Sequence, residues 1–229
     1  MKLSIVMPVL DEAPGLAGAL GDLAPLRAAG AQVVVVDGGS RDGTAAVAGS
    51  LADRVLTSPR GRAAQMNAGA RAATGDTLLF LHADTRLPAN AREAIDRALT
   101  AGHAWGRFDV TIEGASRWLP VVAAFMNARS RLTGIATGDQ AIFATREAFE
   151  AAGAYPPIAL MEDIALCRAL KRLGPPACLR ERVATSGRRW ERHGPVRTIL
   201  LMWRLRLAYF LGADPARLAE RYGAHRPAR

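Results

Sequence analysis

The fold follows from the stretch Val33-Val34-Val35-Val36-Asp37-Gly38-Gly39-Ser40-Arg41-Asp42-Gly43-Thr44. Four consecutive valines predict a strand buried on both faces, as in a parallel sheet. This strand brings Asp37 to the carboxyl edge of the sheet, where the glycines let a ligand approach the backbone. A carboxylate there can accept hydrogen bonds from a nucleobase or a ribose hydroxyl. The same Ser, Asp and Gly residues are also ordinary in turns and helix caps, so the stretch alone leaves both interpretations open.

Short apolar runs alternate with helix-like stretches over the first hundred residues. We expect strands at 3–7, 33–36, 54–57 and 78–81, and helices at 14–29, 43–51, 61–73 and 89–101. This alternation predicts an α/β fold with a mostly parallel sheet flanked by helices and a ligand at the carboxyl ends of the strands. The later pattern is looser, with strands at 105–112 and 140–145 and helices at 118–132, 161–173 and 196–211.

The charge is concentrated near the C-terminus. The chain has 229 residues and a net charge of +9; residues 1–185 hold 20 basic and 18 acidic side chains, and residues 186–229 hold 10 and 3. We therefore expect one domain over 1–185 and a basic helical extension over 186–229. A basic segment attracts nucleic acid, anionic lipid or a phosphorylated small molecule. Half of the residues are hydrophobic, which excludes a disordered chain.

The two cysteines and the N-terminal residues indicate a cytoplasmic protein. Cys167 and Cys178 lack the spacing of a zinc site or a disulfide framework. We also expect no signal peptide and no transmembrane helix, because no apolar stretch is long enough.

Polar side chains follow two further strands. Asp11 and Glu12 follow the first strand, and His82 and Asp84 follow the strand at 78–81. The period of two places His82 and Asp84 on one face, where they could hold a divalent cation on a diphosphate. No GxGxxG or GxxxxGK[ST] motif is present, so Rossmann oxidoreductase and P-loop chemistry lack their phosphate cradles.

An ordered set of motifs resembles the family 2 glycosyltransferases. The motifs are Pro8-Val9-Leu10-Asp11-Glu12, Asp37-Gly38-Gly39-Ser40-x-Asp42-Gly43-Thr44, Arg60-Gly61-Arg62-Ala63-x-Gln65-Met66-Asn67-x-Gly69 and Asp84. The pieces His82-Ala83-Asp84-Thr85 and Gly138-Asp139-Gln140-Ala141 are similar to the radical-SAM/selenodomain-associated transferase subfamily. The resemblance implies a GT-A fold, with a nucleotide-sugar-binding half over 1–100 and an acceptor half over 101–185.

The resemblance also implies the donor site. The residues expected to bind the nucleotide sugar are Pro8, Asp11, Glu12, Asp37, Gly38, Arg62 and Asp84. Asp84 is the last acid of the family's DxD-type motif and would hold Mg²⁺ or Mn²⁺ on the diphosphate, with His82 or His193 as a further metal ligand. The chain departs from the family where His82 takes the motif's first acidic position and where Asp11 replaces a common Asn.

Glu162 and Asp163 start a predicted amphipathic helix. Acids in a first turn interact favourably with the helix dipole, which alone explains many such pairs. Here the pair matches the Glu-Asp motif of the resembled family, which implies that Asp163 is the general base of inverting transfer and Glu162 its positioning partner. An acceptor hydroxyl needs such a base, and the leaving diphosphate needs a metal ion or an Arg.

Four more residues are expected beside the acceptor or the diphosphate. The resemblance places Asp139 and Gln140 there. The segment 186–190 resembles a degenerate Q/RxxRW signature, in which Arg189 would pair with the diphosphate and Trp190 would form a wall for the acceptor.

The helix at 196–211 has a broad apolar face interrupted by Arg197, Arg204 and Arg206. It packs on the domain, on a second subunit in a homodimer, or at the inner face of a membrane as an interfacial helix. Nucleic acid is not expected as a partner, because the acidic sheet edge repels phosphate.

We expect an inverting, hexosyltransferase-like enzyme that moves a sugar from a UDP- or GDP-sugar to an acceptor hydroxyl. The alternatives are a nucleotide-sugar-binding protein without turnover and a nucleotidyltransferase that uses the same sheet edge.

Overall fold

The computed structural model describes residues 1–223, apart from the side chains of Arg189, His193 and Pro195. Its strands are β1 (Leu3–Val9), β2 (Gln32–Asp37), β3 (Arg54–Thr57), β4 (Thr77–Phe80), β5 (Thr85–Arg86), β6 (Trp105–Glu113), β7 (Phe143–Thr145) and β8 (Ala177–Ser186). Its helices are α1 (Ala13–Gly21), α2 (Ala24–Ala28), α3 (Thr44–Leu51), α4 (Arg62–Ala72), α5 (Ala91–Thr100), α6 (Leu119–Thr133), α7 (Arg146–Ala151), α8 (Glu162–Leu170), α9 (Arg188–His193), α10 (Pro195–Phe210) and α11 (Pro215–Gly223), with a 3-10 turn, η1, at Gly138–Gln140.

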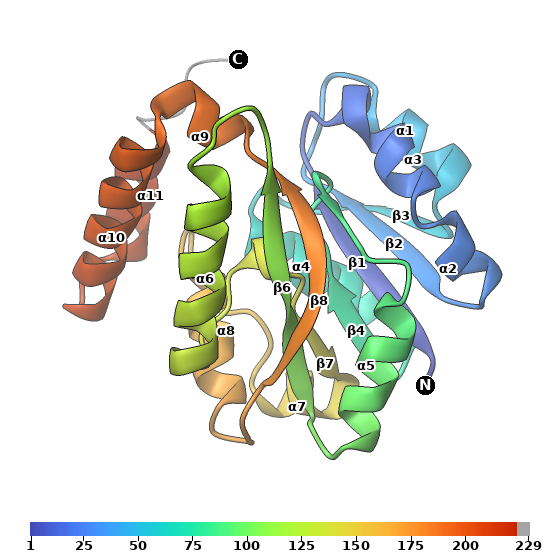
Figure 1. Cartoon of the computed structure of the whole chain (residues 1–229). Coiled ribbons are helices and arrows are strands. Elements are labelled where there is room, and N and C mark those ends of the chain that lie inside the picture. Colours follow the sequence, from blue (N-terminus) through green and yellow to red (C-terminus); the bar gives the residue numbers. More distant parts are fainter. Residues whose placement is uncertain (224–229) are drawn as a thin grey trace.

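The strands form one sheet in the order β3-β2-β1-β4-β7-β6-β8-β5 (Figure 1). Strands β1 to β4 pair in parallel, β7 runs antiparallel to both β4 and β6, and β8 returns parallel to β6. The expected mostly parallel α/β fold is confirmed. Because β1 and β2 end in register, with Val9 opposite Asp37, their following loops start side by side at the carboxyl edge.

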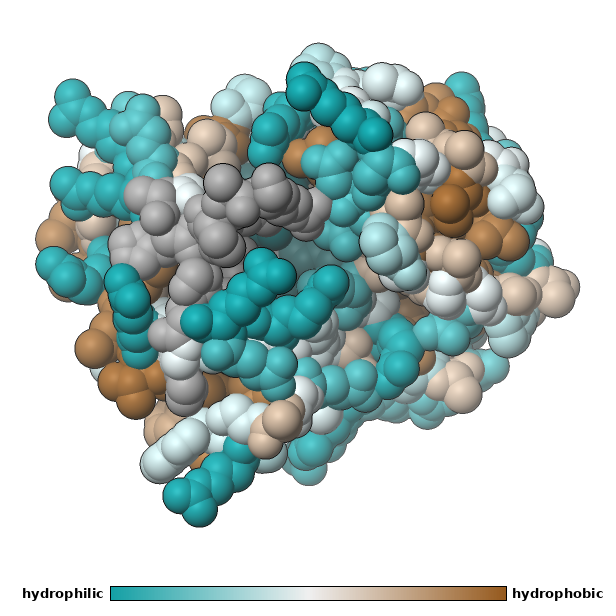
Figure 2. Space-filling model, turned by 90° about the horizontal axis from the view of Figure 1, so that it is seen from above, coloured by the Kyte–Doolittle hydropathy of each residue, from teal (hydrophilic) through white to brown (hydrophobic). Residues whose placement is uncertain are grey.

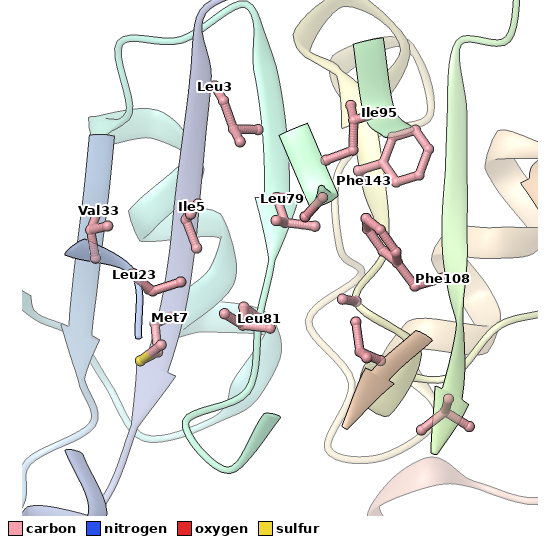
Figure 3. Packing of buried hydrophobic residues seen from close by; sticks show 14 of the residues in the cluster. Leu3, Ile5, Met7, Leu23, Val33, Leu79, Leu81, Ile95, Phe108 and Phe143 are labelled. Atoms are coloured by element: carbon pink, nitrogen blue, oxygen red, sulfur yellow. The ribbon is translucent and has the colours of Figure 1, made fainter. Parts of the chain in front are cut away.

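The buried strands explain the layered architecture. Ile5 and Met7 point to one face of the sheet, and Val6 points to the other. The first face is covered by α1, α3, α5 and α6, and the second by α4, α7 and α8. Figure 3 shows the first face, where side chains of β1, β2 and β4 pack together with Phe108 of β6 and Phe143 of β7. Continuous apolar runs suit these strands because both of their faces are buried.

Helix α4 packs unusually close to β1 and β2. A Cβ at Gly69 would lie 2.3 Å from Cγ1 of Val6, so only glycine allows this approach. One turn earlier, Nε2 of the buried Gln65 donates to the carbonyl oxygens of Val9 at 2.8 Å and Val36 at 2.9 Å. The part of α4 that contains Gln65 and Gly69 therefore connects the carboxyl ends of β1 and β2.

Two of the expected elements are wrong in their extent. The predicted helix over 14–29 is two helices, because Pro25 cannot donate a helical hydrogen bond and its ring would meet the carbonyl of Gly21. The predicted strand over 140–145 starts only at Phe143, because residues 138–140 form η1.

Strand β8 was not expected from the sequence at all. It contains Arg180, Glu181 and Arg182 and has no apolar run, as is typical of a strand that is largely exposed on one side.

The C-terminal helices pack against the domain. Leu205 of α10 and Leu218 of α11 are buried with Met161 and Ile164 at the start of α8. Figure 1 shows α10 and α11 side by side, beyond α6. Within residues 1–223, no helix combines the length and the apolar character needed to cross a membrane. The division at residue 185 stays a prediction.

We expect Gly69→Ala to lower the free energy of unfolding by about 1–3 kcal/mol, because the added methyl group overpacks the contact with Val6. Gly18→Ala is the matched control: Gly18 lies on the exposed side of α1 with no atom near its missing Cβ, and this change should stabilise the helix by about 0.5–1 kcal/mol. Urea unfolding of both variants measures the difference. Equal effects would contradict the close contact of α4 with the sheet.

Candidate active site

The loops after β1 and β2 are joined by hydrogen bonds. The Asp11 amide donates to Ser40 Oγ at 2.9 Å, and the Arg41 amide donates to Asp11 Oδ1 at 2.9 Å. Farther along, the Glu12 amide donates to Thr44 Oγ1 at 2.9 Å. Asp11 has a positive φ of 52°, a conformation that Asp and Asn tolerate best among residues with a side chain. Asp11 thus stabilises the conformation of the loop, and its contact with a ligand stays a prediction.

Asp37 lies buried at the end of β2, with 4% of its surface exposed. Its carboxylate accepts a hydrogen bond from the Ser40 amide at 3.1 Å and another from the Ser40 hydroxyl. Gly38 follows, and a Cβ there would lie only 3.1 Å from the side chain of Gln65. The edge therefore holds Asp37 in one orientation. Its predicted contact with a nucleobase stays a prediction, as do those of Pro8 and Gly38.

The expectation that His82 and Asp84 share a strand face is wrong. Strand β4 ends at Phe80, and the chain then turns, with the Thr85 amide donating to the His82 carbonyl at 3.1 Å. The period of two therefore does not apply to these residues. His82 Nδ1 lies 3.3 Å from Asp139 Oδ1, whereas Asp84 faces the C-terminal segment.

Arg188, the first residue of α9, lies between two of the predicted donor-site acids. Its Nη2 is 4.0 Å from Glu12 Oε2 and 4.0 Å from Asp84 Oδ2. The signature was expected to use Arg189, whose side chain lies outside the described residues, as does that of His193. The structure therefore adds Arg188 to the site.

Asp163 is held at the start of α8 by two backbone amides. The Gly138 amide donates to Asp163 Oδ2 at 3.1 Å, and the Ile164 amide donates to Oδ1 at 2.7 Å. A Cβ at Gly138 would lie 2.4 Å from the His82 ring, so the close packing at this point requires glycine. Turn 137–140 thereby connects the His82 turn to the start of α8.

Burial governs the ionisation of the two acids of α8. It raises the pKa of Glu162, which is 5% exposed, and the charge of Asp163 raises that pKa further. Burial also raises the pKa of Asp163, which the two amides and the charge of Arg62 oppose. Arg62 thus lies within electrostatic reach of both acids. A carboxyl group with a raised pKa suits a general base, because its proton affinity is closer to that of the group it serves.

The structure adds Arg129 of α6 to this region. In the part of the chain that the structure describes, its buried Nε and Nη2 atoms have no hydrogen-bond partner, and neither has Thr137 Oγ1. Burial lowers the pKa of Arg129, and the charge of Asp163 opposes this shift. Arg129 was not expected from the sequence. The signal that could have indicated it is the polar segment from Asn127 to Arg131, which is unusual in a helix that covers a sheet.

Two residues that were predicted to contact the acceptor or the diphosphate pack against the protein itself. Gln140 is fully buried, and its Nε2 donates to Ser130 Oγ at 3.0 Å. Trp190 packs partly buried against the main core. These contacts support the turn 138–140 and α9, and the predicted roles of the two residues in acceptor binding stay predictions. Cys167 is no nucleophile here, because burial raises the pKa of its thiol to about 12.

Asp84 could hold a divalent cation together with a substrate. Among residues 1–223 no three His, Cys, Asp or Glu side chains are grouped as a complete metal site. The Asp84 carboxylate is 37% exposed at the edge, and His82 is turned to Asp139 instead. This set fits Mg²⁺ or Mn²⁺ only if the diphosphate and water supply the remaining oxygens, as Mg²⁺ commonly requires.

The strand ends, their loops and the start of α8 together form one polar edge. Figure 2 looks down on the molecule from above and shows hydrophilic side chains around a hollow. Ion pairs, hydrogen bonds and charge interactions along this edge link Glu12, Asp37, Arg62, His82, Asp84, Asp139, Glu162, Asp163 and Arg188.

Comparisons with known proteins agree with this architecture. A family model described as "Glycosyl transferase family 2" matches residues 4–150. The mannosyltransferase PcManGT from Pyrobaculum calidifontis, solved with GDP-Man and Mn²⁺, is 21% identical with a TM-score of 0.63, over 99% of this chain and 70% of that one. S. aureus TarS with UDP-GlcNAc is 15% identical with a TM-score of 0.64, over 81% of this chain and 58% of that one.

A third solved structure is glucosyl-3-phosphoglycerate synthase from Mycobacterium tuberculosis with Mn²⁺, UDP and glucosyl-3-phosphoglycerate. It is 18% identical with a TM-score of 0.55, over 81% of this chain and 70% of that one. At these identities the likeness establishes the fold, and the expected GT-A fold is confirmed. A search of curated proteins finds no match.

We expect Glu162→Gln to raise the thermal stability at neutral pH. A carboxyl group whose pKa is raised by folding stabilises the fold most below its ordinary pKa, here 4.5, and this contribution is lost as the pH rises through the raised value. The amide of the Glu162→Gln variant stays neutral, so the variant does not lose stability through ionisation at this position. Each 1 kcal/mol gained raises Tm by about 2–4 °C in a chain of this size.

Scanning calorimetry at pH 7 and at pH 4 checks this expectation, and the gain should shrink at pH 4. Glu220→Gln on the exposed side of α11 is the control and should change little. A Glu162→Gln protein less stable than the parent at pH 7 would contradict the burial of this charge.

Proposed function

The chain belongs to glycosyl transferase family 2, and we propose that it is an inverting enzyme in which Asp163 is the general base. The observation that carries this proposal is the placement of Asp163, which two backbone amides hold beside the donor edge. The turn that carries Gly138 packs against His82 and donates to Asp163, which supports one site shared by the donor loops and the start of α8.

The donor that we propose is a UDP- or GDP-sugar. Similar folds have been solved with GDP-Man and with UDP-GlcNAc, which supports a nucleoside diphosphate as the bound part. In this chain Asp37, oriented by Ser40, would accept a hydrogen bond from the base or the ribose. Arg188, which lies beside Asp84, and Arg62, which acts on the charge of Asp163, would supply positive charge for the diphosphate.

Asp84 would hold the divalent cation, together with oxygens of the diphosphate. When bound, such a cation neutralises the negative charge that grows on the leaving diphosphate. The Mn²⁺ in structures of similar proteins supports this assignment. Arg188, which lies beside the Asp84 carboxylate, adds a second positive charge at the same place.

Asp163 would accept the proton of the acceptor hydroxyl. The hydroxyl oxygen bonds to the anomeric carbon while the bond from that carbon to the diphosphate oxygen breaks, and the diphosphate leaves with the electron pair. Attack from the side opposite the leaving group inverts the anomeric centre. Burial and the charge of Asp139 raise the pKa of Asp163, which increases its affinity for the hydroxyl proton, and the charge of Arg62 opposes this shift.

A nucleotidyltransferase would use the same edge but release pyrophosphate from a nucleoside triphosphate. The family assignment favours sugar transfer. A binding protein without turnover would have no need for a buried carboxylate with a raised pKa at the hollow.

We expect GDP or UDP to bind more tightly with Mn²⁺ than without it. Asp84→Asn should remove most of this gain, about tenfold in Kd, because the cation loses its protein oxygen. Asp163→Asn should bind the nucleotide as the parent does, since Asp163 lies on the acceptor side. It should release nucleoside diphosphate from the sugar donor about 100-fold more slowly or worse, the loss typical of a missing general base.

Isothermal titration calorimetry measures binding, and a coupled assay measures the nucleoside diphosphate released. Asp96→Asn on the exposed side of α5 is the control for both variants. The proposal is overturned if neither UDP nor GDP binds, or if Asp163→Asn keeps the parent's rate of release.

A further inference from the structure

Helix α10 presents a stripe of large apolar side chains to solvent. Five of its residues and the residue after it are each more than half exposed: Val196, Leu200, Trp203, Leu207, Phe210 and Leu211. The most exposed of them in α10, Val196 and Trp203, have 66% of their surface accessible. Single exposed apolar residues are ordinary on protein surfaces, but a continuous patch of this kind marks an interaction site.

The stripe has arginines on both of its borders. At 100° per residue, its six members fall within an arc of about 100° of the helix. Arg197 and Arg204 lie along one border of this arc, and Arg206 lies along the other. Helix α10 contains no Asp or Glu. This pattern is typical of helices that lie in a membrane interface, with apolar side chains at the acyl boundary and arginines at the phosphates.

The opposite side of α10 is already used by the fold. Leu205, which lies opposite the stripe, is buried with Met161, Ile164 and Leu218. The helix therefore does not need the exposed stripe in order to pack on the domain. In Figure 2, hydrophobic side chains also gather at the left end, where Figure 1 places α10 and α11.

A groove between α10 and α11 continues the same surface. Its volume is about 900 Å³, and its walls come from Val196, Leu200, Leu201, Leu205, Ala208 and Leu218. Arg197, Arg204 and Arg221 line it as well. An apolar groove lined by guanidinium groups fits an acyl chain with an anionic head group at its end.

We propose that α10 docks this protein on the surface of an anionic lipid bilayer. The stripe enters the boundary between head groups and acyl chains, and the three bordering arginines contact lipid phosphates. A second copy of the chain is a poorer partner, since its stripe would bring Arg197, Arg204 and Arg206 of both copies together with no acid on either α10. A bilayer rich in anionic lipid supplies the complementary charge.

Docking also determines where the polar edge lies. Helix α9 starts at Arg188 beside Asp84 and leads directly into α10. A docked α10 therefore holds the hollow close to the lipid surface, where it would meet an acceptor at the membrane. This consequence rests on the proposed function, whereas docking itself does not.

The test is co-sedimentation of the full chain with vesicles of phosphatidylcholine alone or mixed with phosphatidylglycerol. We expect binding to the anionic vesicles only, and weaker binding at high salt because the arginine contacts are screened. Trp203→Ser with Leu207→Ser should reduce partitioning by about tenfold or more, since it removes the centre of the stripe. Phe210 is left unchanged, because Arg168 stacks on its ring at 5.9 Å.

A second variant, Arg197→Gln with Arg204→Gln, should lose the preference for anionic vesicles. Arg172→Gln with Leu173→Gln is the matched control, as it removes an exposed arginine and leucine beyond α8 and should bind as the parent does. Circular dichroism and nucleotide binding check that each variant is folded. Because nucleotide binding is measured separately from vesicle binding, a protein that fails to dock can be distinguished from one that lacks the proposed enzymatic function.

The proposal is overturned if the parent does not bind anionic vesicles, or if the stripe variant binds them as well as the parent. It is also overturned if sedimentation velocity shows a dimer that the stripe variant dissociates, because the stripe would then be an interface between two copies.

Discussion

The carboxyl edge depends on one buried amide. Where β1 and β2 end, the carbonyl oxygens of Val9 and Val36 both accept hydrogen bonds from Nε2 of Gln65. The Val9 carbonyl also accepts from the Gly38 amide at 3.0 Å, and the Gln65 amide adds the contact that ties both strand ends to α4. Gly69 lets the helix come close enough, and Gly38 leaves space for the amide. The loops that carry Glu12 and Asp37 therefore start from fixed positions.

The charges around the hollow oppose stability and favour chemistry. Burial raises the pKa of both acids at the start of α8, so folding in the ionised state has a cost. Arg62 reduces this cost by attraction, and the Gly138 and Ile164 amides reduce it by hydrogen bonding. Arg129 adds a further, partly buried charge nearby. Domains accept such arrangements mainly where a reaction needs the charges.

The basic C-terminal segment has two different tasks in this structure. Its first described arginine, Arg188, faces Glu12 and Asp84 at the donor edge. Its later arginines border an apolar stripe on α10, away from that edge. The described arginines of this basic segment thus serve both a candidate active site and a candidate membrane surface.

The sequence by itself determined the layered fold, since the apolar runs of β1, β2 and β4 and the strand-end position of Asp37 depend on local periodicity. It also singled out Asp163, through its motif. Tertiary structure alone decided that His82 turns to Asp139, that Arg188 reaches Asp84, and that two nitrogens of Arg129 are buried near Asp163. Local periodicity also failed for β8, whose partner β6 lies about 70 residues earlier in the chain. The sequence did not predict these contacts because the residues that make them are far apart along the chain. Gln65 is 56 residues from Val9, and Gly138 is 25 residues from Asp163, so packing rather than local pattern sets these contacts.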